Sequence, residues 1–161
     1  MTKNPPPLQA DELKDAVRES IMTEKEAMDF YRYASERVYD PQASLTLRLL
    51  SREEYQHARS FYEAYPGNDL PPFDTLMDGP PNITSTWWQA LEQARLADFN
   101  EQKALALAIE QEKQLEQSLR QMAERIDDSK IRQVYLANAE MTHRHLEAVS
   151  EDLNAISAAS D

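Results

Sequence analysis

The chain has 161 residues, enough for one domain with a substantial core, and its few glycines, 2 against 9 prolines, favour helices separated by sharp breaks. Its net charge of −12, without a basic cluster, argues against nucleic acid and anionic membranes as partners. The absence of cysteine excludes disulfides and any metal centre held by thiolates. No stretch approaches the ~18 apolar residues of a membrane span, and the start lacks the apolar segment of a signal peptide, so we expect a cytoplasmic protein without membrane contact.

The first half of the chain predicts two long helices after a short lead. Residues 1–9 are rich in proline, and we expect them to be disordered. Residues 10–39 carry apolar side chains at helical spacing, and residues 41–65 do so again, with two polar residues inside the apolar stripe. Pro41 separates the two helices because it disfavours a helical conformation in the residue before it and suits the first turn of the next helix.

The second half predicts a long connection followed by two more long helices. Residues 66–84 contain both glycines and several prolines, which indicates a crossover loop. Residues 87–96 predict a short helix or a kinked extension of the helix that follows. Long helices over residues 101–126 and 130–156 come next, and strand-like alternation is absent. Because a long crossover lets the second and third long helices run parallel, we predict an all-α four-helix bundle as one domain over residues 10–157.

One pattern of acidic residues and histidine occurs twice. In each half, a lone Glu on one predicted helix is followed, about 30 residues later, by Glu-x-x-His on the next. The residues concerned are Glu24, Glu54, His57, Glu112, Glu140 and His143. Residues three apart share one helix face, so these helices would point four carboxylates and two imidazoles into the core. Such an arrangement is a site for two metal ions.

Helical phase decides which acidic residues face the core. On the third long helix, steps of three, seven, ten and fourteen residues from Glu112 reach apolar side chains, whereas the same steps from Glu110 reach polar ones. The same steps from Glu24 meet alanine, tyrosine and valine. On the second helix, Glu54 lies on the apolar stripe and Glu53 does not. We therefore expect Glu24, Glu54 and Glu112 to be buried.

Buried carboxylates in this number predict bound cations. Four of them without counter-charge would each cost several kcal/mol, more than a fold stable by ~5–15 kcal/mol tolerates. Two divalent ions would neutralise them. Carboxylate and imidazole ligands suit iron, so we predict two iron ions as cofactors, with manganese or zinc possible in purified samples.

Single elements of the pattern have simpler explanations. One Glu-x-x-His is most often a surface ion pair, so the prediction of a metal site depends on the two matched copies. His145 has no Glu three residues before it, and we expect it at the surface or at the boundary of the core. Tyr31 either packs in the core or lies near the metals as a hydrogen-bond donor or radical sink.

The segments around these motifs resemble the rubrerythrin branch of the ferritin-like superfamily. Residues 24–31 (EKEAMDFY) and 50–57 (LSREEYQH) look like the first and second helix motifs of that family. Residues 108–112 (AIEQE) and 136–143 (LANAEMTH) resemble the third and fourth. The resemblance spans residues 13–150, and it implies an up-down-down-up ferritin-like bundle with a di-iron centre.

The resemblance also implies a role for each ligand. Two glutamates would bridge the irons, two would be terminal ligands, and each imidazole would complete one iron. The bridging pair is Glu54 and Glu140, the terminal pair is Glu24 and Glu112, and the imidazoles are those of His57 and His143.

The chain departs from the family pattern in two ways. It lacks the cysteine-ligated rubredoxin domain that delivers electrons in full-length rubrerythrins, and Leu115 stands where typical members carry an extra glutamate. We expect a di-iron oxidoreductase of rubrerythrin-like type that oxidises an Fe(II) pair with peroxide or dioxygen, uses an external electron donor and forms a homodimer. The alternatives are a ferroxidase or iron-storage protein and a metal-free helical interaction module.

Overall fold

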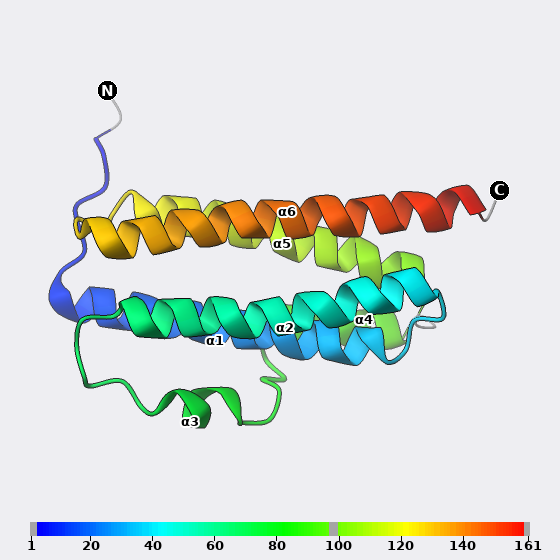
Figure 1. The fold of residues 1–161 in the computed structure, drawn as a ribbon, viewed down its shortest axis with the longest axis horizontal. Helices are drawn as coiled ribbons and strands as arrows, with labels where there is room; N and C mark the ends of the chain where they lie inside the picture. The colour runs from blue at the N-terminus through cyan, green and yellow to red at the C-terminus, as the bar shows by residue number, and fades with distance from the viewer. Residues whose placement is uncertain (1–2, 97–99, 160–161) are drawn as a thin grey trace.

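The protein is all-α in the computed structural model, which describes residues 3–96 and 100–159. Among these residues, four long helices form a bundle and two shorter ones lie in the connection between its halves (Figure 1). The long helices are α1 (Ala10–Ser35), α2 (Pro41–Ala64), α5 (Glu101–Ala123) and α6 (Ser129–Ala159). The short helices are α3 (Phe73–Met77) and α4 (Thr86–Leu96). The predicted fold class, an all-α ferritin-like four-helix bundle, is confirmed.

The long helices form two antiparallel hairpins joined by a crossover. α1 packs along α2, α5 packs along α6, and α2 also packs against α6. In Figure 1, α2 and α5 run in the same direction, because the chain returns along the length of the bundle between them. The crossover predicted over residues 66–84 contains α3, which packs against α1, and leads into α4, which contacts both α1 and α5.

Side chains at the predicted breaks cap the long helices. Asp40 accepts a hydrogen bond from the Ala43 N–H at 2.8 Å, and Pro41 occupies the first turn of α2. At the start of α6, Asp128 accepts a hydrogen bond from the Ile131 N–H at 3.0 Å. Each such cap satisfies a backbone donor that the helix itself leaves unpaired, which is worth ~1 kcal/mol.

Some helix ends differ from the prediction by about one turn. α1 ends at Ser35 and α5 at Ala123, before the predicted residues 39 and 126, and α6 continues to Ala159. After α5, the Arg125 and Ile126 N–H groups bond to carbonyls three residues back, at 3.0 and 3.3 Å, which tightens the final turn. Ile126 stays buried, so the apolar face continues through that turn.

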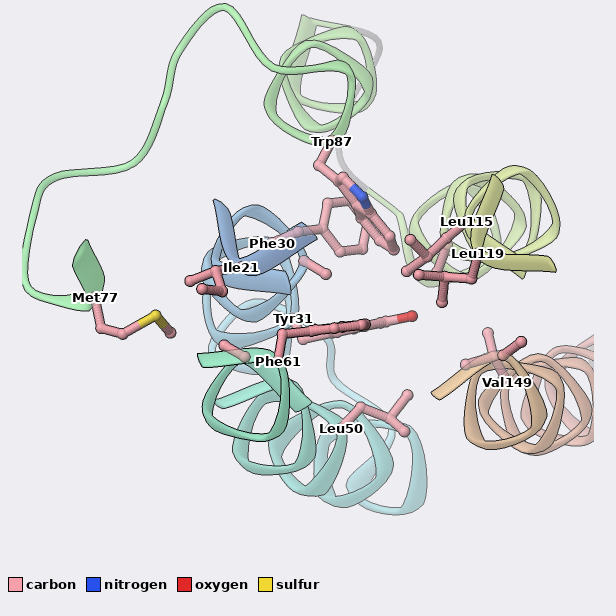
Figure 2. Close-up of a cluster of buried hydrophobic side chains, with 14 of the residues drawn as sticks. Ile21, Phe30, Tyr31, Leu50, Phe61, Met77, Trp87, Leu115, Leu119 and Val149 are labelled. Atoms are coloured by element: carbon pink, nitrogen blue, oxygen red, sulfur yellow. The ribbon is translucent and has the colours of Figure 1, made fainter. Parts of the chain in front are cut away.

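The core between the helices is apolar and rich in aromatic rings (Figure 2). Tyr31 is fully buried, and Trp87 from α4 packs edge-on against it and against Phe30, with ring centroids 5.5 and 5.1 Å apart. In Figure 2 the Tyr31 hydroxyl points away from α1 toward the side of the bundle formed by α5 and α6. The aromatic packing therefore aims a polar group into the bundle interior.

The segment before α1 lies along the end of α5. The Leu8 N–H donates to the Arg125 carbonyl at 2.8 Å, and Arg125 Nε donates to the Pro6 carbonyl at 3.1 Å. The disorder expected for residues 1–9 stays a prediction. Within the described ranges, each helix falls short of the length or the apolar content that crossing a membrane requires.

Candidate metal centre

Three glutamates are buried in the middle of the bundle. Glu24 on α1, Glu54 on α2 and Glu112 on α5 each have 0% of their surface exposed. Glu110 and Glu53, which helical phase placed outside, are exposed. A buried carboxylate is costly unless a counter-charge or hydrogen bonds compensate it. Three carboxylates together therefore indicate a binding site rather than ordinary core packing.

Two stacked imidazoles complete the cluster. His57 on α2 and His145 on α6 are buried, with ring centroids 5.1 Å apart and an interplanar angle of 9°. The Nδ1 atoms of both rings face Glu54. One ligand atom from each of these three residues lies within 4.8 Å of the others, a grouping that can hold a metal ion.

Glu54 lies between the two imidazoles. Its Oε1 is 2.7 Å from Nδ1 of His145, and its Oε2 is 3.5 Å from Nδ1 of His57. Glu24 Oε2 is 3.8 Å from Nδ1 of His57, and Glu112 Oε1 is 3.6 Å from Nδ1 of His145. The cluster thus divides into an α1 half-site (Glu24, His57 and Glu54 Oε2) and an α5 half-site (Glu112, His145 and Glu54 Oε1).

The facing atoms of this cluster lack hydrogen bonds within the described part of the chain. Both oxygens of Glu24, both oxygens of Glu54 and Oε2 of Glu112 are without a hydrogen-bond partner there. The Nδ1 atoms of His57 and His145 also lack a hydrogen-bond partner among the described residues. Buried polar atoms without partners are rare, and oxygen and imidazole donors of this kind ligate iron, manganese and zinc. The donor set therefore fits two divalent ions with Glu54 between them.

Two hydrogen bonds hold ligand side chains in place. The Tyr31 hydroxyl donates to Glu112 Oε1, so this tyrosine is both a core residue and a hydrogen-bond donor at the site. On the far side of the His145 ring, Nε2 lies 2.6 Å from Glu53 Oε2. An imidazole bonded to a carboxylate through one nitrogen presents the other nitrogen in a fixed orientation. Glu53 thereby orients His145 toward the centre.

Burial and neighbouring charges act on the three carboxylates. Burial raises the pKa of Glu24 well above its usual value, and the charge of Glu54 raises it further. Burial also raises the pKa of Glu112, with partial compensation from His145. For Glu54 the effect of burial is outweighed by its contacts with Glu24 and the two imidazoles, which hold its pKa well below the usual range. Of the three carboxylates, Glu54 is thus the one that most strongly favours the ionised form.

The carboxylates in turn favour protonated imidazoles. Burial alone would lower the pKa of His57, but Glu24 and Glu54 outweigh it and raise this pKa to about 10. Burial is likewise outweighed at His145, where Glu112 and Glu54 raise the pKa to about 11. These protons offset the buried negative charge of the metal-free protein. Metal binding must displace them, because a metal-ligating imidazole is neutral.

The structure does not bring Glu140 and His143 to the cluster. The Glu140 side chain is 58% exposed and lies 3.5 Å from Arg120. The His143 side chain is 44% exposed and pairs with Glu116 at 2.8 Å and with Glu147 at 3.2 Å. The expectation that these two residues face the core is contradicted, because they lie on the outer face of α6 and make surface ion pairs.

His145 occupies the place expected for His143. It is 3% exposed, so the expectation of a surface or boundary position is wrong. Two residues along a helix amount to a rotation of about 200°, which turns the two rings to nearly opposite sides. In the structure, steps of three, seven and four residues from His145 reach Thr142, Asn138 and Val149, all on the buried face of α6. The signal in the sequence was weak, because Thr142 and Asn138 are polar, and the test of apolar phase that separated Glu112 from Glu110 does not separate His145 from His143.

A four-helix bundle with a long crossover and a core of carboxylates and imidazoles places the chain in the ferritin-like class of helical proteins. The family model for rubrerythrin matches residues 15–151, and the chain belongs to the rubrerythrin family, whose domain is that of di-iron carboxylate proteins. The resemblance identified from the sequence motifs is thereby confirmed. Comparisons with curated proteins and with solved structures give no match.

Proposed function

We propose that the protein is a di-iron oxidoreductase of rubrerythrin type, whose ions are held by Glu24, Glu54, His57, Glu112 and His145. The observation that carries the proposal is the position of Glu54, whose two oxygens face different imidazole Nδ1 atoms at 2.7 and 3.5 Å. A further buried carboxylate lies beside each ring. Membership of the rubrerythrin family supports iron as the metal, although manganese and zinc suit the same donors.

The chain's own residues would bind the ions, orient the ligands and exclude water. Bound as Fe(II), the ion pair supplies two electrons to peroxide or dioxygen, and an external donor restores them. Full burial of the three glutamates keeps bulk solvent from the ions. The Tyr31 hydroxyl fixes one oxygen of Glu112, and Glu53 fixes the ring of His145.

Leu115 supports activity with both oxidants. It lies one turn after Glu112 on the buried face of α5, where the family resemblance leads one to expect an additional glutamate. An apolar side chain can neither ligate iron nor exchange with an imidazole as the oxidation state changes. We therefore propose that the ligands stay nearly the same in both states and that peroxide has no strong advantage over dioxygen.

Anaerobic titration with Fe(II), followed by calorimetry and elemental analysis, tests metal binding. We expect two ions per chain in the wild type, loss of both in Glu54→Ala and loss of at least one in Glu112→Ala, because Glu54 contributes to both half-sites. Glu110→Ala, which removes an exposed carboxylate from the same helix as Glu112, is the matched control and should retain two ions.

Stopped-flow absorbance after mixing the loaded protein with peroxide or dioxygen tests the oxidation step. We expect oxidation of the bound Fe(II) by both. The proposal fails if the wild type binds no more iron than Glu54→Ala, or if bound iron reacts with neither oxidant.

A further inference from the structure

The two helices that supply imidazoles to the cluster differ at one position. Glu54 precedes His57 by three residues on α2, whereas Thr142 precedes His145 by three residues on α6. Residues three apart share a helix face, and Thr142 is buried, with 1% of its surface exposed. Di-metal carboxylate bundles carry a glutamate at both of these positions. Thr142 therefore stands where a second bridging carboxylate is expected.

Thr142 cannot replace that carboxylate. Its Oγ1 donates to the Asn138 carbonyl at 2.8 Å. This bond within the helix occupies the only proton of the hydroxyl group. The side chain is neutral and ends at its γ atoms. Compared with glutamate, it lacks the terminal carboxylate, which consists of one carbon and two oxygens. A formate ion has this same set of heavy atoms.

The cluster is consequently one negative charge short for two divalent ions. Glu24, Glu54 and Glu112 supply three negative charges when ionised, against the four positive charges of the ions. The imidazoles add none, because they ligate metals in the neutral form. Glu53, beyond the far nitrogen of His145, is 48% exposed, so solvent screens its charge. One uncompensated positive charge therefore remains in a buried site.

We propose that the metal-loaded centre binds a small monoanionic carboxylate, of the size of formate or acetate, in place of the side-chain carboxylate that Thr142 lacks. This inference rests on the proposed function, since it requires two bound ions. The anion supplies both the missing charge and the two missing donor oxygens. Because it is not part of the chain, it can exchange, which makes this position a binding site for a carboxylate ligand.

Calorimetric titration with formate tests the inference on protein loaded with Mn(II), which avoids oxidation of the metal. We expect one formate per two manganese ions in the wild type and none in the metal-free protein. Thr142→Ser, the matched control that keeps a small hydroxyl, should bind formate like the wild type. Thr142→Glu supplies the carboxylate itself, so it should bind manganese at least about tenfold more tightly and take up no formate.

The outcomes separate this inference from the proposed function. Failure to reach two manganese ions per chain, with or without formate, would overturn the proposed function. Two bound ions without formate uptake, or equal uptake by the metal-free protein, would overturn the anion site alone. Uptake by folded Thr142→Glu at wild-type strength would overturn it as well. If Thr142→Glu does not fold, formate uptake by the metal-loaded wild type and Thr142→Ser, compared with the metal-free protein, still tests the anion site.

Discussion

His145 and His143 lie two residues apart on α6, and the structure gives them different surroundings. His145→Ala removes the Nδ1 donor of the α5 half-site, so affinity for the ion there should fall by at least about tenfold. His143→Ala removes only the surface pairing with Glu116 and Glu147, so both ions should remain. Manganese titration of the two variants measures the difference. Loss of an ion in His143→Ala but not in His145→Ala would show that the register of α6 is wrong.

We predict that Leu115 determines the choice of oxidant. In Fe(II)-loaded wild-type protein we expect comparable oxidation rates with peroxide and dioxygen, because Leu115 offers no ligand that could shift with the oxidation state. Leu115→Glu adds a carboxylate one turn after Glu112 and should favour peroxide. Lys113→Glu adds one on the exposed face of the same helix and should change neither rate. Stopped-flow absorbance gives the rates; a strong wild-type preference for peroxide that Leu115→Glu leaves unaltered would contradict this explanation.

At the scale of the element, the start of α2 depends on its cap. Asp40→Ala removes the acceptor for the Ala43 N–H, so the free energy of unfolding should fall by ~1 kcal/mol. Glu36→Ala changes an exposed acidic residue just before this helix and should stay within about 0.5 kcal/mol of the wild type. Urea unfolding of both variants checks this, and an equal loss in the two would show that capping is not the cause.

At the scale of the whole molecule, the metal-free cluster makes stability depend on pH. Despite burial, the neighbouring carboxylates raise the pKa of His57 to about 10 and that of His145 to about 11 from the ordinary value of 6.5. A group whose pKa is raised by folding stabilises the fold below its unfolded pKa and loses that contribution as the pH rises through its folded pKa. The two imidazoles therefore contribute fully below about pH 6.5 and progressively less toward about pH 10 to 11.

Urea unfolding of the metal-free protein between about pH 7 and pH 10 measures this dependence. We expect the free energy of unfolding to fall across that range. Glu54→Gln removes a charge that raises both imidazole pKa values and should flatten the dependence, whereas Glu110→Ala should preserve it. Stability that stays constant or rises in the wild type would mean that the imidazoles are not held protonated by the cluster.

Helix positions and the inward faces of α1, α2 and α5 could be predicted from the sequence because both are local properties. Apolar spacing within one helix sets the face that is buried, and residues such as Pro41 set the boundaries. Phase alone therefore separated Glu112 from Glu110 and Glu54 from Glu53, and the structure buries the first of each pair. The class of fold followed as well, since a long proline-rich connection between the second and third long helices allows them to run parallel.

The composition of the cluster was decided by the tertiary structure. The motif ending in His143 shows only that two side chains share a helix face, and not that this face is turned inward. The contacts of His145 with Glu53 and of Tyr31 with Glu112 join residues 92 and 81 positions apart, so they exist only because whole helices pack together. The sequence by itself determined the burial of Glu24, Glu54 and Glu112, because the apolar stripes of α1, α2 and α5 fix the inward faces of those helices, whereas the expected burial of Glu140 on α6 was wrong. His57 was predicted as well, but the second imidazole depends on how α6 packs against the other helices, and only the folded structure showed that it is His145 and not His143.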